Sequence, residues 1–122
     1  MLGCGVDRDY PAAHGQLARQ ICKRGLVVSE YAPGVEPAPW RFPARNRVIA
    51  GLAAATVVVE ARERSGALIT ADFALEAGRE VFAVPGEITS ALSAGTNALL
   101  RLGATPLTAA ADVLESLGLE PP

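Results

Sequence analysis

Short runs of branched apolar residues alternate along this chain with segments whose apolar residues recur every three or four positions. The runs predict strands that end at Met1–Leu2 or span residues 26–30, 56–60 and 81–84, with Leu107 in a short edge strand behind Pro106. The helically spaced segments lie between them. Strands that alternate with helices predict an α/β fold, with a mostly parallel sheet flanked by helices. The continuous β-branched run predicts that residues 56–60 form a central strand.

The first predicted helix is bounded by Pro11, which suits a helix start, and by Gly25, which suits the position after a helix end. Its apolar stripe comprises Leu17, Ala18, Ile21 and Cys22. We expect Cys22 on this buried face and Cys4 at a strand end, both reduced, as in a cytoplasmic protein. Two cysteines and one histidine do not supply the four ligands of a zinc site, and no cofactor is expected.

Composition limits the size and class of the protein. With 122 residues, half of them apolar and only 5% aromatic, the chain predicts one domain over residues 1–122 with an aliphatic core. No apolar run approaches the length of a membrane span and no signal peptide is recognisable, so we expect a cytoplasmic protein with no membrane partner. The net charge of −2 argues against a general polyanion-binding surface.

Basic residues are nevertheless concentrated in one part of the chain. Five of the eleven Lys and Arg fall between positions 41 and 64, namely Arg41, Arg45, Arg47, Arg62 and Arg64. The stretch 40–52 combines the first three with Asn46, Trp40 and Phe42. Guanidinium groups bind phosphate oxygens in a bidentate manner, and an aromatic ring can stack on an unpaired base. This combination predicts an anionic ligand, with Trp40 or Phe42 as the stacking residue.

The proline in this stretch sets the expected helix start. Because proline biases the preceding residue away from the α region, we expect the helix to begin after Pro43. Arg45 and Asn46 then lie in its first turn, where unpaired amides and the helix dipole favour an anion. The alternative is a solvated helix start whose arginines pair with Glu60 or Glu63.

A second informative stretch, residues 60–70, follows the strongest predicted strand. Ser65 is a plausible N-cap, and Gly66 permits a close backbone approach at the start of the next helix. This arrangement presents free amides to a phosphate, although an ordinary cap with a glycine for tight packing explains it equally well. Thr96 and Asn97 open a further helix at the same predicted end of the sheet, so they are candidates to line the same cleft.

The order of motifs resembles that of one known family. The chain contains Gly3-Cys4-Gly5-Val6-Asp7 with Tyr10-Pro11, then Ser29-Glu30-Tyr31, Phe42-Pro43-Ala44-Arg45-Asn46-Arg47, Ser65-Gly66-Ala67-Leu68-Ile69-Thr70, Val84-Pro85-Gly86 and Gly95-Thr96-Asn97. Over nearly its whole length it resembles the DNA-processing protein A family, DprA, also called Smf. The arginine and Ser-Gly motifs are specific in combination.

The resemblance implies a three-layer, Rossmann-like domain of which this chain is the second half, truncated at the N-terminus. It also implies a protein that is not an enzyme, that binds single-stranded DNA, forms a homodimer and loads the RecA recombinase onto DNA during natural transformation. Carried over by position, Arg45 and Arg47 contact phosphates and Asn46 orders the loop. Ser65, Gly66 and Thr70 offer hydrogen-bond donors at a helix start, and Tyr10 or Phe42 contacts a base. Arg41 is a further candidate DNA-binding residue.

Two other readings are open on the sequence. One is a nucleotide phosphoribohydrolase of the related lysine-decarboxylase-like (LOG) group, although the loop at residues 64–70 lacks that group's glycines and downstream glutamate. The other is self-association through a leucine-rich stripe that is also a candidate core: Leu99, Leu102, Val113, Leu114 and Leu117.

Overall fold

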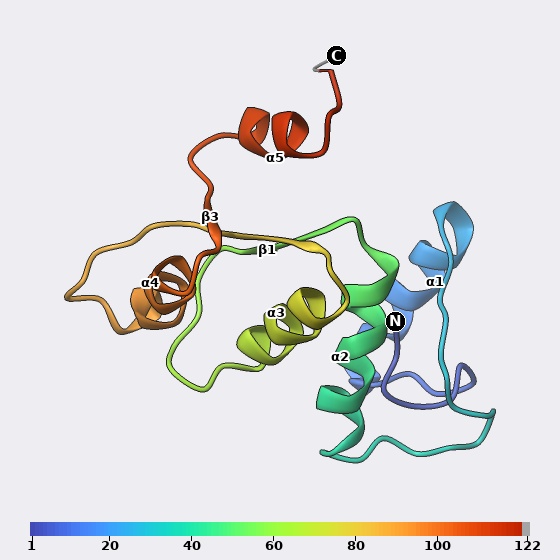
Figure 1. Cartoon of the computed structure of the whole chain (residues 1–122). Coiled ribbons are helices and arrows are strands. Elements are labelled where there is room, and N and C mark those ends of the chain that lie inside the picture. Colours follow the sequence, from blue (N-terminus) through green and yellow to red (C-terminus); the bar gives the residue numbers. More distant parts are fainter. Residues whose placement is uncertain (121–122) are drawn as a thin grey trace. The chain divides into compact units, whose positions relative to one another are not determined.

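The computed structural model describes residues 1–120, which divide into two compact units, Met1–Val48 and the chain from Ile49 onward (Figure 1). Helix α2, Arg41–Leu52, begins in the first unit and ends in the second. The prediction of one partial domain over residues 1–122 stays a prediction. Within the described residues, no helix is long and apolar enough to cross a membrane.

In the first unit, two extended segments run side by side without forming a regular strand pair. Leu2 N–H donates to the Val28 carbonyl and Gly5 N–H to the Val35 carbonyl, each at 2.9 Å. Residues 1–2 and 26–30 contain no assigned strand, so the two strands predicted there are wrong for this structure. A strand needs a ladder of backbone bonds on at least one side, and these segments share too few of them.

The helix predicted after Pro11 is confirmed as a short 3-10 turn, η1 (Ala12–His14), continued by α1 (Gly15–Arg24). Its apolar stripe, however, is not buried. Leu17 and Ile21 are 49% and 43% exposed, and Cys22 is exposed as well, so the prediction of a buried Cys22 is wrong, whereas Cys4 is buried as expected. That side of α1 lines an open hollow of about 680 Å³, whose other walls come from the segments 1–2, 6–10 and 26–27.

Helix α2 starts earlier than the proline predicted. It begins at Arg41, so Pro43 lies inside the first turn, and the prediction that Arg45 and Asn46 occupy that turn is wrong. The first turn of a helix tolerates proline because its amides have no partner within the helix. The side chain of Arg79 donates to the Gly51 carbonyl at 3.1 Å, a favourable place for a cation because the helix ends there.

The second unit is built on a parallel sheet of order β1-β2-β3, formed by β1 (Ala55–Val58), β2 (Glu80–Ala83) and β3 (Thr105–Pro106). This confirms the α/β class. The central strand is β2, whose Val81, Phe82 and Ala83 are buried, and not β1, which is an edge in this sheet. The β-branched run in residues 56–60 predicted a central strand wrongly, because the composition of a strand reflects how deeply its faces are buried. It does not show whether a strand has hydrogen-bonded neighbours on one side or on both. Pro106 lies in an edge strand, as predicted.

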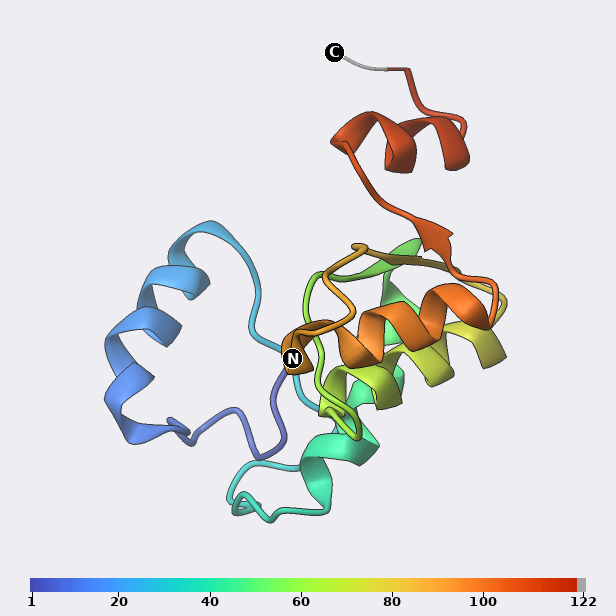
Figure 2. The same ribbon diagram turned by 90° about the vertical axis from the view of Figure 1, so that its left-hand side faces the viewer.

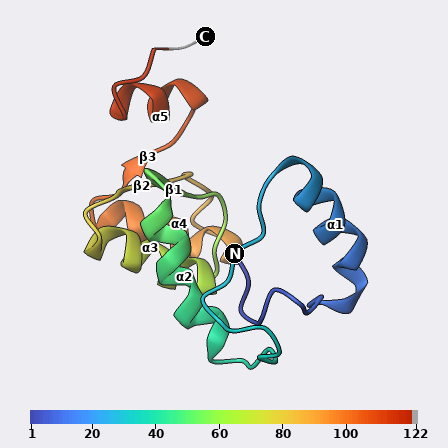
Figure 3. The same cartoon turned by 90° about the vertical axis from the view of Figure 1, so that its right-hand side faces the viewer.

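Helices α3 (Gly66–Glu76) and α4 (Ala94–Arg101) lie on the same side of this sheet (Figures 2 and 3). Because β–α–β crossovers are right-handed and both steps move the same way along the sheet, both helices must fall on one face. The core beneath them consists mainly of small side chains, including Ala50, Val58, Ala71, Ala74, Val81 and Leu99. The aliphatic core that the composition predicted is confirmed, and its alanines allow helix and sheet to approach closely.

The proposed leucine stripe does not form one surface of uniform burial. Leu99 is buried in the core, whereas Leu102 is 80% exposed. The stripe's other members belong to α5 (Ala110–Ser116) and the residue that follows it, and they are half-buried. Leu99 therefore has the role of a core residue, and self-association through the rest stays a hypothesis.

Candidate nucleic-acid interface

Charge is distributed unequally between the two units. The first unit carries seven Lys and Arg against four Asp and Glu, a net charge of +3, whereas the second carries four against nine, a net charge of −5. The total of −2 therefore conceals a basic unit. An anionic ligand is favoured on the first unit, which is the one that contains the arginines of α2.

Around Phe42 the structure brings together three of the predicted site residues. The rings of Tyr10 and Phe42 stack with their centroids 5.6 Å apart, and the Arg45 guanidinium lies over the Phe42 ring at the same distance. Phe42 also packs against Gly3, where an added Cβ would lie 2.8 Å from the ring. Packing against Phe42 thus explains the glycine at position 3. The Phe42 ring has neighbours on several sides.

Arg45 and Asn46 form one hydrogen-bonded pair. Arg45 Nε donates to Asn46 Oδ1 at 3.1 Å, and Arg45 Nη1 donates to the Met1 carbonyl at 2.7 Å. Arg45 is half-buried, so its guanidinium plane is held by these contacts and by the Phe42 ring. Asn46 thus holds the side chain of Arg45, and the implied role of Asn46 in ordering a loop stays a prediction.

Arg47 makes an ion pair, but with a different acid from the one expected. Its Nη2 bonds to Glu30 Oε2, so the alternative pairing with Glu60 or Glu63 is wrong for this residue. Both side chains remain accessible, at 54% and 35% exposure. Such a pair contributes only about 0–1 kcal/mol, which an incoming phosphate can replace.

Arg41 is held among aromatic rings. Its guanidinium carbon lies 4.5 Å from the centroid of the Trp40 ring and 5.4 Å from that of Tyr31, and its Nη1 donates to the Glu36 carbonyl. Its Nε is buried without a hydrogen-bond partner among the described residues. Sequence reasoning missed the part played by Tyr31. The signal was the aromatic residue that ends the Ser29-Glu30-Tyr31 motif.

In the second unit the start of α3 is confirmed as a capped helix. Ser65 Oγ accepts from the Ala67 amide at 3.3 Å, which leaves other first-turn amides without a partner within the helix. At Gly66 an added Cβ would meet nothing within 4 Å, so tight packing does not explain this glycine. Thr70 Oγ1 lies 3.5 Å from the Gly66 carbonyl and donates back into its own helix.

The backbone of the loop before Ser65 is held in a defined conformation. Arg64 adopts a left-handed conformation with φ of 62°, which is uncommon for a residue with a side chain. Gly95 donates to the Ala61 carbonyl at 2.7 Å, and an added Cβ at Gly95 would lie 2.7 Å from that oxygen. The start of α4 therefore braces the loop that presents Ser65 and Gly66.

Thr96 and Asn97, which follow Gly95 in the Gly95-Thr96-Asn97 motif, also have structural roles. Thr96 is only 1% exposed and donates to the Ser93 carbonyl, so the expectation that it lines a cleft is wrong. Asn97 bonds both the amide and the carbonyl of Gly86, at 3.2 and 3.1 Å. It fixes the turn after β2.

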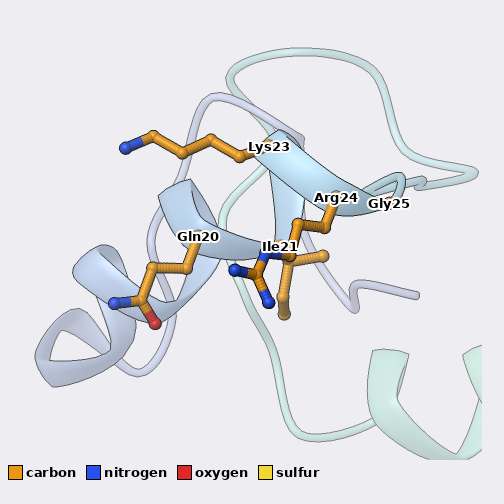
Figure 4. A pocket seen from close by; sticks show the side chains of 5 residues that line it. All are labelled: Gln20, Ile21, Lys23, Arg24 and Gly25. Atoms are coloured by element: carbon orange, nitrogen blue, oxygen red, sulfur yellow. The ribbon is translucent and has the colours of Figure 1, made fainter.

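A further hollow of about 670 Å³ lies at the end of α1 and is lined by Gln20, Ile21, Lys23, Arg24 and Gly25 (Figure 4). All five come from one helix end, and Lys23 extends away from Ile21 and Arg24. The polar side chains that line this hollow do not converge on a common point, so we assign no ligand to it. Among the described residues, no group of three or more His, Cys, Asp or Glu is placed to hold a metal ion.

The chain is similar to known proteins of one family. A family model described as DNA recombination-mediator protein A matches residues 1–118. DNA processing protein DprA of Streptococcus pneumoniae is 48% identical over 93% of this chain and 40% of its own length, and Protein Smf of Escherichia coli is 44% identical over 96% and 32%. The chain thus spans less than half the length of these relatives.

Solved structures give the same result. The X-ray structure of DprA from Streptococcus pneumoniae matches with a TM-score of 0.87 and 49% identity, over 93% of this chain and 40% of that one. A structure of DNA processing protein A from Helicobacter pylori, described by its single-stranded DNA binding mode, matches with a TM-score of 0.84 and 28% identity, over 94% and 53%. These matches give the phosphoribohydrolase reading no support, and the chain belongs to the DNA recombination-mediator protein A family, DprA/Smf.

Proposed function

We propose that this chain is a single-stranded DNA-binding module. The observation that carries the proposal is the arrangement on α2, where Arg45 is held in place by Asn46, Phe42 and the Met1 carbonyl while Arg47 stays half-exposed beside it in sequence. A fixed guanidinium and an accessible one, in a unit of net charge +3, suit a chain of phosphates better than a single small anion.

The family supports this ligand. The Helicobacter pylori relative is described by its single-stranded DNA binding, and this chain covers 53% of it. We extend the ligand to this chain because the arginine motif that carries the family resemblance is assembled here by contacts inside one unit. Phe42 and Tyr10 pack in the cluster around Arg45, and Arg41 precedes Phe42 on α2 as a further candidate contact.

Each guanidinium has a distinct part in binding. Arg45 enters the complex already ordered, so little side-chain entropy is lost when it meets a phosphate. Arg47 exchanges Glu30 for a phosphate oxygen, which is favourable because the exposed ion pair contributes little. Glu30 thereby weakens DNA binding modestly and keeps the arginine extended.

The second unit supplies an anion contact of its own at the start of α3. Gly66 leaves open space beside first-turn amides, and Ser65 caps the helix without filling that space. A phosphate placed there gains the amides and the positive end of the dipole. Thr70 belongs to the same helix face, one turn further along.

We assign no catalytic step to the chain, because the family's recombination-mediator name fits a protein that acts by binding. The proposal includes loading of the RecA recombinase onto DNA. It also includes a homodimer, a cytoplasmic location and a partial Rossmann-like domain over residues 1–122.

The test is a comparison of two double variants of the full chain. Arg45→Gln/Arg47→Gln removes the proposed phosphate contacts, and Arg19→Gln/Arg24→Gln removes the same charge from α1 in the same unit. Fluorescence anisotropy of a labelled oligothymidylate gives the affinities. Each charge-assisted hydrogen bond contributes about 1.5–3 kcal/mol, so the first variant is expected to bind at least about tenfold more weakly.

The control variant is expected to lose only a long-range contribution that disappears at moderate salt. Equal losses in the two variants would show that net charge alone attracts DNA and that α2 is not the site. Circular dichroism and thermal melting confirm that both variants fold.

A further inference from the structure

The single tryptophan of the chain stands out among its aromatic residues. Trp40 is 63% exposed, directly before α2, and one face of its ring meets the Arg41 guanidinium at 4.5 Å. Phe42 is surrounded by Tyr10, Arg45 and Gly3, as described above. Of the two aromatics in the motif, Trp40 is the one with a large accessible surface.

The position of Trp40 is maintained by a row of stacked groups. The guanidinium carbon of Arg41 lies over the Tyr31 ring at 5.4 Å as well as over Trp40, and its Nη1 donates to the Glu36 carbonyl. Within residues 1–120 the buried Nε has no hydrogen-bond acceptor. Arg41 thus gives up a hydrogen bond and keeps its contacts with the rings, which indicates that its role is to fix Trp40.

An exposed indole held over a cation is suited to a flat ligand with a π face. Arg45 and Arg47 follow on the same helix and favour phosphate. An unpaired nucleobase attached to a sugar-phosphate chain satisfies both features at once, since any base can stack on an aromatic ring. An apolar protein segment would satisfy the indole but not the arginines.

We propose that Trp40 is a base-stacking platform for single-stranded nucleic acid, and that Arg41, supported by Tyr31, is its positioning residue. The inference rests on the proposed function, because the base is brought to Trp40 by the strand whose phosphates the arginines hold. It adds to that function a stacking contact that tolerates any base.

Because the chain has one tryptophan, its fluorescence reports on this site directly. Unlabelled oligothymidylate is expected to quench the emission in a saturable way, with the midpoint measured by anisotropy. An abasic oligonucleotide of equal length, which has phosphates but no bases, is expected to bind without that quenching. Anisotropy that saturates while tryptophan emission stays unchanged would overturn the inference and leave DNA binding intact. An unchanged anisotropy would overturn both.

Variants separate stacking from folding. Trp40→Ala is expected to weaken oligothymidylate binding about 10- to 100-fold, and Trp40→Phe, which keeps a ring, much less. Leu26→Ala removes another exposed apolar side chain, 78% exposed, from the same unit and serves as the matched control. If Trp40→Ala binds as tightly as this control, the platform is refuted.

The role of Arg41 has its own readout. Arg41→Gln is expected to lower the steady-state polarisation of tryptophan emission before any DNA is added, because the indole loses its stacked neighbour. Arg41→Lys retains a cation that can lie over the ring and is expected to restore part of the polarisation. An indole that is as rigid in Arg41→Gln as in the parent chain would refute the positioning role.

Discussion

Two glycines at helix starts have opposite surroundings. Gly66 opens α3 into empty space, whereas Gly95, in the first turn of α4, lies against the Ala61 and Arg62 carbonyls. Alanine at position 66 is expected to stabilise the fold by about 0.5–1 kcal/mol, because it restricts the unfolded chain and meets no obstacle. Alanine at position 95 is expected to destabilise it by about 1–3 kcal/mol, because backbone oxygens must move.

Urea unfolding of the two variants measures both signs. The same Gly66→Ala protein is expected to bind oligothymidylate more weakly than the parent, since the new methyl group occupies the space proposed for a phosphate. A Gly66→Ala chain that is more stable and binds equally well would refute the proposed phosphate contact at the start of α3.

The ion pair between Glu30 and Arg47 gives a second residue-level prediction. Glu30→Gln is expected to change the free energy of unfolding by less than about 1 kcal/mol, because both partners are partly exposed. It is expected to tighten oligothymidylate binding about two- to fivefold, since the phosphate no longer competes with a carboxylate. Titration calorimetry tests this, with Glu36→Gln as a control of equal charge. Weaker binding in Glu30→Gln alone would show instead that the carboxylate orients Arg47.

At the scale of single elements, α5 begins with a charged cap. Asp112 Oδ2 accepts from the amides of Thr108 and Ala109, at 2.7 and 3.0 Å, and from the Thr108 hydroxyl. Hydrogen bonds from the Thr108 amide, then the Ala109 amide and the Thr108 hydroxyl, hold the pKa of Asp112 below its ordinary value of 3.8. The ionised carboxylate therefore favours the folded helix start.

The pH dependence follows from the sign of that shift. A lowered native pKa means that the cap stabilises α5 above pH 3.8 and that this stabilisation is lost as the pH falls through the lowered value. Asp112→Ala is expected to increase amide hydrogen exchange in α5 at neutral pH and to have little effect in acid. Glu115→Ala, in the last turn, is the control. An Asp112→Ala effect that persists in acid would contradict the assigned cap.

The sequence predicted some elements well and misplaced others for identifiable reasons. The cap of α3 at Ser65 is confirmed, because capping is a local property of a few residues. Helix α1 ends just before Gly25 as expected, but Gly25 has φ of −151° and does not form the left-handed C′ cap. The start of α2 was misread because Pro43 is compatible with both the position before a helix and its first turn. The position of β1 at the edge of the sheet depends on which strands pair with it, and a local sequence pattern does not show that pairing.

At the scale of the whole molecule, the arginine motif was found from the sequence, but its partners were not. The contacts of Arg45 with Met1 and of Arg47 with Glu30 join positions 44 and 17 residues apart. Composition likewise hid the division of charge, because the total of −2 combines +3 in the first unit and −5 in the second. The contacts depend on how the chain folds back on itself, and the division of charge depends on where the boundary between the units lies.

The most direct test of the account is the salt dependence of oligothymidylate binding by the parent chain and by Arg45→Gln/Arg47→Gln. If the two guanidinium groups each neutralise a phosphate, the slope of log affinity against log salt concentration becomes about 1.4 less negative in the variant. An unchanged slope, with both proteins binding the strand, would contradict the claim that α2 of this chain grips the phosphates of single-stranded DNA.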